Sequence, residues 1–493
     1  GAMFGLTILN VLLLVGSVLT IENSYVIPTP KLELLSPKGF QMSIPHEEGM
    51  VLFAFHGTLN RVENKDSPGD LYGDVTSHTN GRWVYKNTNA ALEPGDVLRY
   101  WIHVQKGNQV YRLIDQSVVI PENGAVVNNI DNERPVTHPT PDGSNEDCVL
   151  SKTTVKGRHV CQGELIFEDN FNVFNWTIWK KEIRIPCDAV DAEFVSFQNR
   201  PQNCYIRDGH LYIVPTLLTE VGYTEENIRR GELNFGTDCT GIFDIAHECR
   251  RQADHFRILP PIVSARIRTR DYFSFRYGKV EVRARLTKGD WLFPQIFLEP
   301  SSNEYGISGY ASGQMRVAFI RGNELLKLKN GEEIGGSRLS GGVVLTTGDT
   351  YRDVWLKNSF RPDHLGLTFH TYTLTWGEDA ISLAIDGNNY ATIRGGFSSL
   401  STTHNISYAK LWENGNMIAP FDREFYIALG VSAGGISDFP DGSRTAANFH
   451  PKPWENSDPK AELRFWNDRQ NWHNTWDGEN AGMAIDYVKV WAL

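Results

Sequence analysis

The stretch that decides the fold reads Phe275-Arg-Tyr-Gly-Lys-Val-Glu-Val-Arg-Ala-Arg-Leu286, and apolar and charged residues alternate over its second half. Such alternation places the two kinds of side chain on opposite faces of a β-strand. Similar patterns occur in residues 369–376, 381–385 and 483–491, and Asp386-Gly387 gives a hairpin signal after the second of them. Residues 148–493 are therefore predicted to form a large β-jelly-roll with a concave face.

The region before this domain also predicts strands. Residues 51–55, 81–85 and 96–104 are short β-like runs separated by Gly, Pro and Asn turns, and no helical pattern interrupts them. Residues 25–121 are thus predicted to be a small immunoglobulin-like β-sandwich, which makes the whole chain all-β. Residues 122–147 are rich in Pro, Asn, Asp, Glu and Thr and are interpreted as a linker.

Composition narrows the class of function. The chain has 493 residues, 41% of them hydrophobic, so two well-packed domains are expected. The formal charge of −11 argues against broad attraction to nucleic acid, which needs a basic surface. The apolar run within residues 4–21 is interpreted as part of a signal peptide covering residues 1–24, which implies a secreted, extracellular protein.

The cysteines and glycosylation motifs agree with secretion. An even number of cysteines behind an export signal favours disulfides, with sequential pairing as the default among several connectivities. The six are Cys148, Cys161, Cys187, Cys204, Cys239 and Cys249. A zinc site near His247 and Cys249 is the alternative, although the chain lacks the paired C-x-x-C spacing. Asn175-Trp-Thr and Asn405-Ile-Ser are glycosylation sequons.

Both halves resemble one known family. Ser36-Pro-Lys-Gly-Phe40, Phe53-Ala-Phe-His-Gly57 and Gly81-Arg-Trp83 look like the glucan-binding module of arthropod β-1,3-glucan recognition proteins, also called Gram-negative bacteria-binding proteins. Gly289-Asp-Trp-Leu-Phe-Pro294 and Pro420-Phe-Asp-Arg-Glu-Phe-Tyr426 resemble the laminarinase branch of glycoside hydrolase family 16. The resemblance implies a concanavalin-like glucanase sandwich for the second half, and that family has the two halves in the same order.

The catalytic positions of the glucanase family are altered here. Active members carry Glu-x-Asp-x-x-Glu followed by Arg-Gly-Asn, and the matching segment is Gly313-Gln-Met-Arg-Val-Ala-Phe-Ile-Arg-Gly-Asn323. The three positions are therefore Gln314, Arg316 and Phe319. In a strand, positions 314 and 316 share a face, and a bulge can bring 319 onto it.

Retaining hydrolysis needs a carboxylate nucleophile and a carboxylic acid about 5–5.5 Å apart. An amide, a guanidinium and a phenyl ring supply neither, so we predict no catalytic residue and no enzyme activity in this domain. The alternative is a different alignment, in which Glu299 and Glu304 are the carboxylates. No cofactor is predicted, because the chain has no recognisable metal or nucleotide motif.

Carbohydrate binding usually needs aromatic side chains that stack on sugar rings and polar partners for the hydroxyls. The resemblance points to Trp83, with Tyr85 on the same strand face, and to Asp70 and Asp74 in an acidic loop. Trp291 resembles the tryptophan that lines the cleft of the active relatives. For each aromatic residue the alternative is burial in the core.

A second strand also carries aromatic residues that could stack on sugar rings. In residues 96–104, alternation puts Tyr100 on one face with other apolar residues, and Arg99, Trp101 and His103 on the opposite face. We expect one of these aromatic faces to be core and the other to be exposed.

The resemblance implies a secreted pattern-recognition protein of innate immunity, acting in haemolymph-type fluid. It would bind microbial polysaccharide, which is β-1,3-glucan or alternatively peptidoglycan or lipopolysaccharide. It would then engage serine-protease zymogens of a Toll or prophenoloxidase type of cascade. The alternatives are a residual endo-β-1,3-glucanase and an adaptor that works with a peptidoglycan recognition protein.

Overall fold

The computed structural model describes residues 25, 27–35, 38–59, 71–93, 96–107, 109–120, 148–186, 192–241, 245–254, 256–307, 309–347, 351–445 and 449–493. The chain divides into two compact units, Gly1–Asp142 and Gly143–Leu493. The predicted signal peptide and linker lie outside the described residues. Within the described part of the chain, no helix is long and apolar enough to span a membrane.

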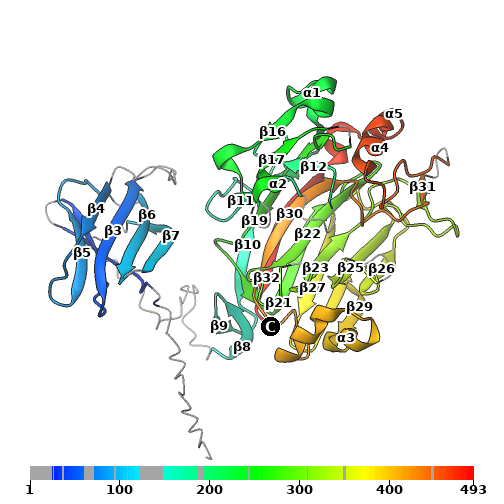
Figure 1. The fold of residues 1–493 in the computed structure, drawn as a ribbon. Coiled ribbons are helices and arrows are strands. Elements are labelled where there is room, and N and C mark those ends of the chain that lie inside the picture. Colours follow the sequence, from blue (N-terminus) through cyan, green and yellow to red (C-terminus); the bar gives the residue numbers. More distant parts are fainter. Residues whose placement is uncertain are drawn as a thin grey trace, which may run out of the picture. The chain divides into compact units, whose positions relative to one another are not determined.

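The smaller unit is a β-sandwich of two antiparallel sheets (Figure 1). The three-stranded sheet has the order β1 (Lys31–Leu34), β2 (Phe40–Pro45), β5 (Arg82–Asn87). The four-stranded sheet has the order β4 (Leu71–Val75), β3 (Met50–Leu59), β6 (Val97–Lys106), β7 (Gln109–Val119). The predicted small sandwich is therefore confirmed.

The core of the smaller unit is built from alternate residues of these strands. On β6, Leu98, Tyr100, Ile102 and Val104 are buried, whereas the residues between them are partly exposed. Trp83 on β5 is also in this core, because only 2% of its surface is exposed and its indole Nε1 donates a hydrogen bond to His46 Nδ1 at 3.1 Å. Alternation thus identifies β6 as a two-faced strand, as the sequence predicts.

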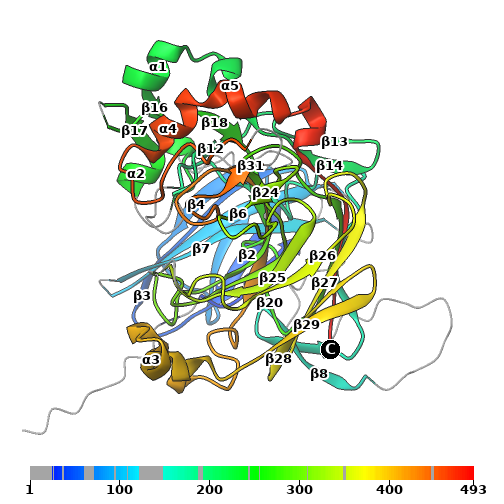
Figure 2. The ribbon, with the colours of Figure 1, turned by 90° about the vertical axis from the view of Figure 1, so that its right-hand side faces the viewer.

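The larger unit is a jelly roll built around two large sheets (Figures 1 and 2). One sheet has the order β13 (Cys204–Arg207), β14 (His210–Ile213), β32 (Met483–Trp491), β21 (Gly278–Arg285), β27 (His370–Trp376), β28 (Ala380–Ile385), β29 (Asn388–Arg394), and β10 (Leu165–Asp169) also pairs with β32. The stretch from which the fold class was predicted forms β20 (Phe275–Arg276) and β21, with Val280, Val282 and Ala284 fully buried.

The second sheet carries the concave surface of interest. Its order is β26 (Leu356–Phe360), β25 (Arg338–Val344), β23 (Gln314–Phe319), β22 (Leu292–Pro300), β30 (Phe425–Ala433), β20, β8 (Leu150–Val155), β9 (Arg158–Cys161). The short strand β19 (Arg266–Arg268) pairs with β30 and with β11 (Lys180–Lys181).

Smaller elements complete the unit. The remaining strands are β12 (Val195–Phe197), β15 (Thr216–Leu217), β16 (Glu232–Asn234), β17 (Arg250–Gln252), β18 (Ile262–Ser264), β24 (Leu326–Lys327) and β31 (Arg444–Thr445). The α-helices are α1 (Glu225–Arg230), α2 (Ile245–Cys249), α3 (Leu400–Thr403), α4 (Ala461–Asn467) and α5 (Arg469–Trp472). Both ribbon views place α4 and α5 at one end of this unit and α3 at the other (Figures 1 and 2).

Two of the three predicted disulfides are present. Cys148 pairs with Cys161, and Cys239 pairs with Cys249, so Cys249 cannot be the thiolate of a zinc site. Cys204 is instead a free thiol buried in the hydrophobic core, where it packs as a small apolar group. Among the described residues Cys204 therefore has no disulfide partner, while Cys187, its partner in the sequential pairing, lies outside them.

The burial of Trp83 predicts a large effect on stability. Trp83→Ala is expected to destabilise the smaller unit by about 3–5 kcal/mol, because it removes a fully packed indole. Hydrogen–deuterium exchange of the peptides that cover β2, β3 and β6 measures the change in the full chain. Tyr72→Ala is the control, since 61% of the Tyr72 surface is exposed. Equal exchange in the two variants would contradict this placement of Trp83.

Candidate functional site

The first candidate surface is the outer face of the four-stranded sheet. Here the strand register sets Tyr72 of β4 opposite His56 of β3, and His56 opposite Trp101 of β6. All three side chains point away from the core, because the core takes the alternate residues Phe55, Tyr100 and Ile102. We call these three residues the aromatic row.

Stacking organises the aromatic row. The rings of His56 and Trp101 lie 3.8 Å apart and 6° from parallel, and the rings of His56 and Tyr72 lie 6.5 Å apart and 10° from parallel. The row crosses three neighbouring strands, and Tyr72 at its end is 61% exposed. The result is an apolar ridge on a β-sheet face, of the kind that can lie against sugar rings.

Polar residues flank the aromatic row on both sides. On one side, Asp74 of β4 is exposed. It lies opposite Ala54 of β3, which in turn lies opposite His103 of β6. On the other side lies Arg99 of β6, which is partly exposed, whereas Thr58 opposite it is buried. Asp74, His103 and Arg99 can exchange hydrogen bonds with sugar hydroxyls. Asp70, the other predicted acidic partner, lies outside the described residues.

The structure contradicts the stacking role predicted for three aromatic residues. Trp83 and Tyr85 are 2% and 6% exposed in the smaller unit, and Trp291 is fully buried in the larger one. A ring that is closed in by its neighbours offers no face to a sugar. The core alternative was correct in each case, because the apolar face of β5 points into the sandwich and Trp291 packs against Phe439 and Trp454.

The second candidate surface is a cleft on the concave sheet of the larger unit. Its empty volume, including the open mouth, is about 1040 Å³. Strand β22 directs Phe293, Gln295, Phe297 and Glu299 into this cleft, while the alternate residues pack inside the sandwich. The rest of the lining comes from β19 and Arg270 just after it, from β23 and β30, from the segments at residues 182–184, 193, 240 and 438, and from residues 303, 306, 307 and 310–313.

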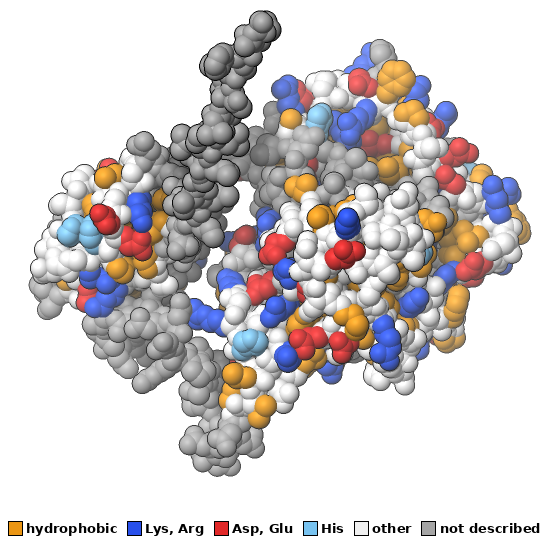
Figure 3. All heavy atoms as spheres, turned by 60° about the horizontal axis from the view of Figure 1, so that its bottom comes forward, with side chains coloured by type: hydrophobic (Ala, Val, Ile, Leu, Met, Phe, Trp, Pro, Cys, Tyr) orange, Lys and Arg blue, Asp and Glu red, His pale blue; other side chains and the backbone are white. Residues whose placement is uncertain are grey.

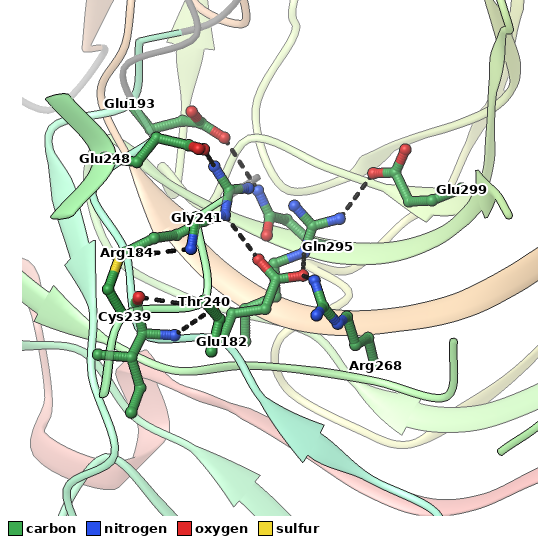
Figure 4. A network of polar contacts seen from close by, with 12 residues as sticks. Glu182, Arg184, Glu193, Cys239, Thr240, Gly241, Glu248, Arg268, Gln295 and Glu299 are labelled. Carbon is green, nitrogen blue, oxygen red and sulfur yellow. Dashed lines mark hydrogen bonds and ion pairs between the residues drawn. The ribbon is translucent and has the colours of Figure 1, made fainter. Parts of the chain in front are cut away.

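A buried carboxylate organises one end of the cleft. Glu182 is 3% exposed and receives a hydrogen bond from Arg184 Nε at 2.8 Å, while Arg266 and Arg268 approach it within 3.7 and 3.9 Å. Figure 4 shows Arg184 between the carboxylates of Glu182 and Glu248. Burial alone would raise the pKa of Glu182, but the three arginines outweigh it and hold that pKa at about 2.

The second disulfide supports this network. Cys249 ends α2, the residue before it is Glu248, and the backbone N–H of Ile185 donates to the Glu248 carbonyl at 2.8 Å. The Glu248 side chain is fully buried and receives Arg184 Nη1 at 3.1 Å. The Cys239–Cys249 bridge therefore anchors the end of α2, which carries the second carboxylate partner of Arg184.

The three positions that the resemblance matches to catalytic residues lie on β23, and Gln314 and Arg316 among them line the cleft. The register shifts between Arg316 and Phe319, which is the bulge that the sequence predicts at this point. As a result the Arg316 guanidinium lies between the rings of Phe297 and Phe319, 4.8 and 4.7 Å from their centroids. Gln314 donates to Glu299 Oε1 at 3.1 Å and accepts from Arg316 Nε at 3.0 Å.

Asp438, which sequence reasoning missed, is the partner of Arg316. It receives Arg316 Nη1 at 2.7 Å and Arg352 Nη1 at 2.9 Å, and its side chain is only 4% exposed. Burial would raise the pKa of Asp438, but Arg316 and Arg352 lower it well below its usual range. The turn at Gly434 and Gly435, both with positive φ, bends the chain after β30 toward this position, and it is the signal that could have suggested Asp438.

Glu299 and Glu304, the alternative carboxylates, occupy different environments. Glu299 lies in the cleft, where it receives Arg266 Nη2 at 2.6 Å and the Gln314 amide, and burial raises its pKa. Glu304 is about half exposed, pairs with Arg423 and does not line the cleft. The cleft thus holds a chain of polar contacts that runs from Arg266 through Glu299, Gln314 and Arg316 to Asp438.

In the face seen in Figure 3, acidic and basic side chains are interspersed with hydrophobic ones over both units. Among the described residues, no group of three or more His, Cys, Asp or Glu side chains could hold a metal ion. Asn175 and Asn405 of the two sequons are exposed.

The environment of Glu182 predicts a pH-dependent loss of stability. Glu182→Gln is expected to lower the free energy of unfolding by about 3–5 kcal/mol near neutral pH, because three arginines lose their shared carboxylate. The folded pKa of about 2 lies below the ordinary 4.5, so this contribution is complete above pH 4.5 and is lost as the pH falls toward 2.

Urea unfolding of both proteins at decreasing pH measures this difference, which should narrow below pH 4.5. Glu232→Gln is the matched control, since the Glu232–Arg250 pair is exposed, and it should leave the unfolding free energy nearly unchanged. A difference between parent and E182Q that stays constant down to about pH 3 would contradict the assigned role of Glu182.

Parts of the chain are similar to known proteins. A family model described as "Carbohydrate binding domain (family 32)", named CBM39, matches residues 26–138. Among solved structures, the laminarinase from Rhodothermus marinus is 18% identical with a TM-score of 0.39, covering 67% of this chain and 98% of that one. The non-specific endo-β-1,3(4)-glucanase SCLam from family GH16 is 18% identical with a TM-score of 0.39, covering 66% and 90%.

Relatives that match over nearly the full length are closer in sequence. Beta-1,3-glucan-binding protein 1 of Galleria mellonella is 37% identical and covers 95% of this chain and 96% of its own length. Gram-negative bacteria-binding protein 1 of Drosophila melanogaster is 36% identical and covers 98% of both chains. Beta-1,3-glucan-binding protein 1 of Manduca sexta is 36% identical over 95% of this chain. The chain therefore belongs to the family of β-1,3-glucan-binding and Gram-negative bacteria-binding proteins.

Proposed function

We propose that the protein is a secreted recognition protein of innate immunity that binds microbial cell-wall polysaccharide, above all β-1,3-glucan, and does not hydrolyse it. The observation that carries the proposal is the aromatic row, which crosses three strands of the smaller unit between flanking polar residues. The names of the full-length relatives, which refer to β-1,3-glucan and to Gram-negative bacteria, support the same ligand class.

The smaller unit would bind the polysaccharide through the aromatic row. Apolar C–H surfaces of the sugar rings would lie against Trp101 and Tyr72, while Asp74 and Arg99 would exchange hydrogen bonds with hydroxyls. A sheet face suits a long polymer because it is open at both ends, unlike a closed pocket. A neutral glucan also needs no net-basic surface, in agreement with the formal charge of −11.

The larger unit would not cleave the ligand. Retaining hydrolysis requires one ionised carboxylate and one protonated carboxylic acid on either side of the scissile bond. At the three positions of the resemblance the chain has the amide of Gln314 and the guanidinium of Arg316, which line the cleft, and the buried phenyl ring of Phe319. The nearest carboxylates, Glu299 and Asp438, are held by arginines. A fixed cation at Arg316 would also disfavour the positive charge of an oxocarbenium-like transition state.

Signalling would follow binding through protein partners. We propose serine-protease zymogens of a Toll or prophenoloxidase type of cascade as the downstream partners, with a peptidoglycan recognition protein as a further partner. The family membership supports this step.

Two substitutions test the binding surface. Trp101→Ala and Tyr72→Ala in the full chain are each expected to weaken retention on the insoluble β-1,3-glucan curdlan by about tenfold or more, because each removes a large apolar contact. Sedimentation with curdlan at several protein concentrations measures the affinity. Val51→Ala serves as control, since Val51 is an exposed apolar residue of the same sheet. If both aromatic variants bound curdlan as well as the parent does, the aromatic row could not be the glucan surface.

A further inference from the structure

The cleft of the larger unit contains more positive than negative side chains. Five arginines line it against four carboxylates. The arginines are Arg184, Arg266, Arg268, Arg270 and Arg316, and the carboxylates are Glu182, Glu193, Glu299 and Asp438. Asp438 is moreover shared with Arg352, which lies behind it. Glu248, also behind the lining, in turn pairs with Arg184, so the arginines that lack a close carboxylate have to be found one by one.

Three of these arginines form a row. Arg266, Arg268 and Arg270 alternate with Ile267 and Thr269, so the three arginine side chains project from the same side of the extended chain into the cleft. Ile267 and Thr269 are fully buried on the other side. Arg266 is paired closely, because its Nη2 lies 2.6 Å from Glu299.

Arg268 and Arg270 are not matched in this way. The carboxylate nearest to Arg268 is Glu182, at 3.9 Å, and Arg184 and Arg266 already share that group. The buried Nε of Arg268 has no hydrogen-bond partner among the described residues. Arg270 donates to the Ser301 carbonyl at 3.3 Å and lies 5.9 Å from the ring of Tyr426, and the described residues give it no carboxylate.

The same cleft also contains a neutral oxygen atom that accepts no hydrogen bond from the described residues. Gln295 is 1% exposed and donates through its Nε2 to Glu193 at 3.1 Å. Its Oε1 is buried and has no hydrogen-bond partner among the described residues. Leaving a buried polar atom unpaired costs about 1–3 kcal/mol, so a ligand that donates a hydrogen bond here would recover that free energy. A sugar hydroxyl is such a donor.

We propose that this cleft binds an anionic saccharide, with a carboxylate or phosphate seated on Arg268 and Arg270 and a neighbouring hydroxyl donating to Gln295 Oε1. The planar guanidinium forks suit both anions, since each can accept two parallel N–H···O bonds. The inference rests on the proposed function, because it assumes that the cleft retains its ligand without cleaving it. The two surfaces would then bind different ligands, with neutral glucan on the aromatic row and a charged sugar in the cleft.

Calorimetric titration of the full chain with three probes tests the inference. The probes are laminaritriose, laminaritriose carrying a terminal 6-phosphate, and trigalacturonate, so that the phosphate and carboxylate sources are separated. At least one anionic probe should bind about tenfold or more tightly than laminaritriose, since hydrogen bonds to charged groups contribute about 1.5–3 kcal/mol. The affinity should also fall as salt is added. If neither anionic probe bound more tightly than laminaritriose, the inference would be wrong.

Variants place the binding in the cleft. The double variant R268Q/R270Q should lose the preference for the anionic probe. R283Q should keep it, because Arg283 lies on β21 and pairs with Asp486 away from the cleft. If the double variant unfolds at a lower temperature than the parent, the anion affinity of the single variant R270Q is measured instead. This variant should stay folded, because the Arg270 side chain donates one hydrogen bond, to the Ser301 carbonyl. Unchanged anion affinity in R270Q would overturn the inference.

The failure of this inference and of the proposed function can be told apart. W101A should lose retention on curdlan but keep the anionic probe, and R268Q/R270Q should do the reverse. If R268Q/R270Q and the parent bound all three probes alike while curdlan retention still depended on Trp101, only the inference about the cleft would fail. Loss of both kinds of binding in W101A would contradict the separation of the two surfaces.

Discussion

The cleft of the larger unit depends on the ion pair between Arg316 and Asp438. A guanidinium buried to 1% exposure must have a partner, because an uncompensated charge in the interior is strongly destabilising. Asp438 provides that partner, and Gln314 links the pair to Glu299 and Arg266. Three carboxylates of the cleft, Glu182, Glu299 and Asp438, are thus held by arginines, and the fourth, Glu193, accepts a hydrogen bond from Gln295. A surface built in this way can hold hydroxyls and anions, but it offers no ionised nucleophile opposite a protonated acid.

The smaller unit exposes aromatic side chains to water on one face of a sheet while the other face packs in the core. Its two sheets close over a core that includes Phe40, Phe55 and Trp83. The opposite face of β3, β4 and β6 is then available for the aromatic row, whose rings cover one another by stacking. The rings of His56 and Trp101 are therefore already in contact without a ligand, which would limit the conformational entropy lost when a glucan binds.

The sequence predicted the all-β class and the two-faced strands, because alternation is a local pattern that any half-buried strand must show. It also predicted the bulge in β23. It could not decide which aromatic face of the smaller unit is exposed, since Trp83 and Trp101 both alternate correctly and only the packing of two sheets against each other separates them. Asp438 escaped notice for a related reason: it reaches Arg316 from a separate loop, across 122 positions of sequence. The free Cys204 likewise reflects burial, which cysteine spacing does not report.

The central claim is that this protein binds glucan without breaking it. The most direct test is to incubate the full chain with laminarihexaose and to follow the release of shorter glucans by mass spectrometry. The same batch of protein is first shown to bind curdlan. We expect the hexaose to stay intact while the protein binds curdlan. Release of shorter products that disappears on changing one carboxylate, with Glu299→Gln as the first choice, would contradict it.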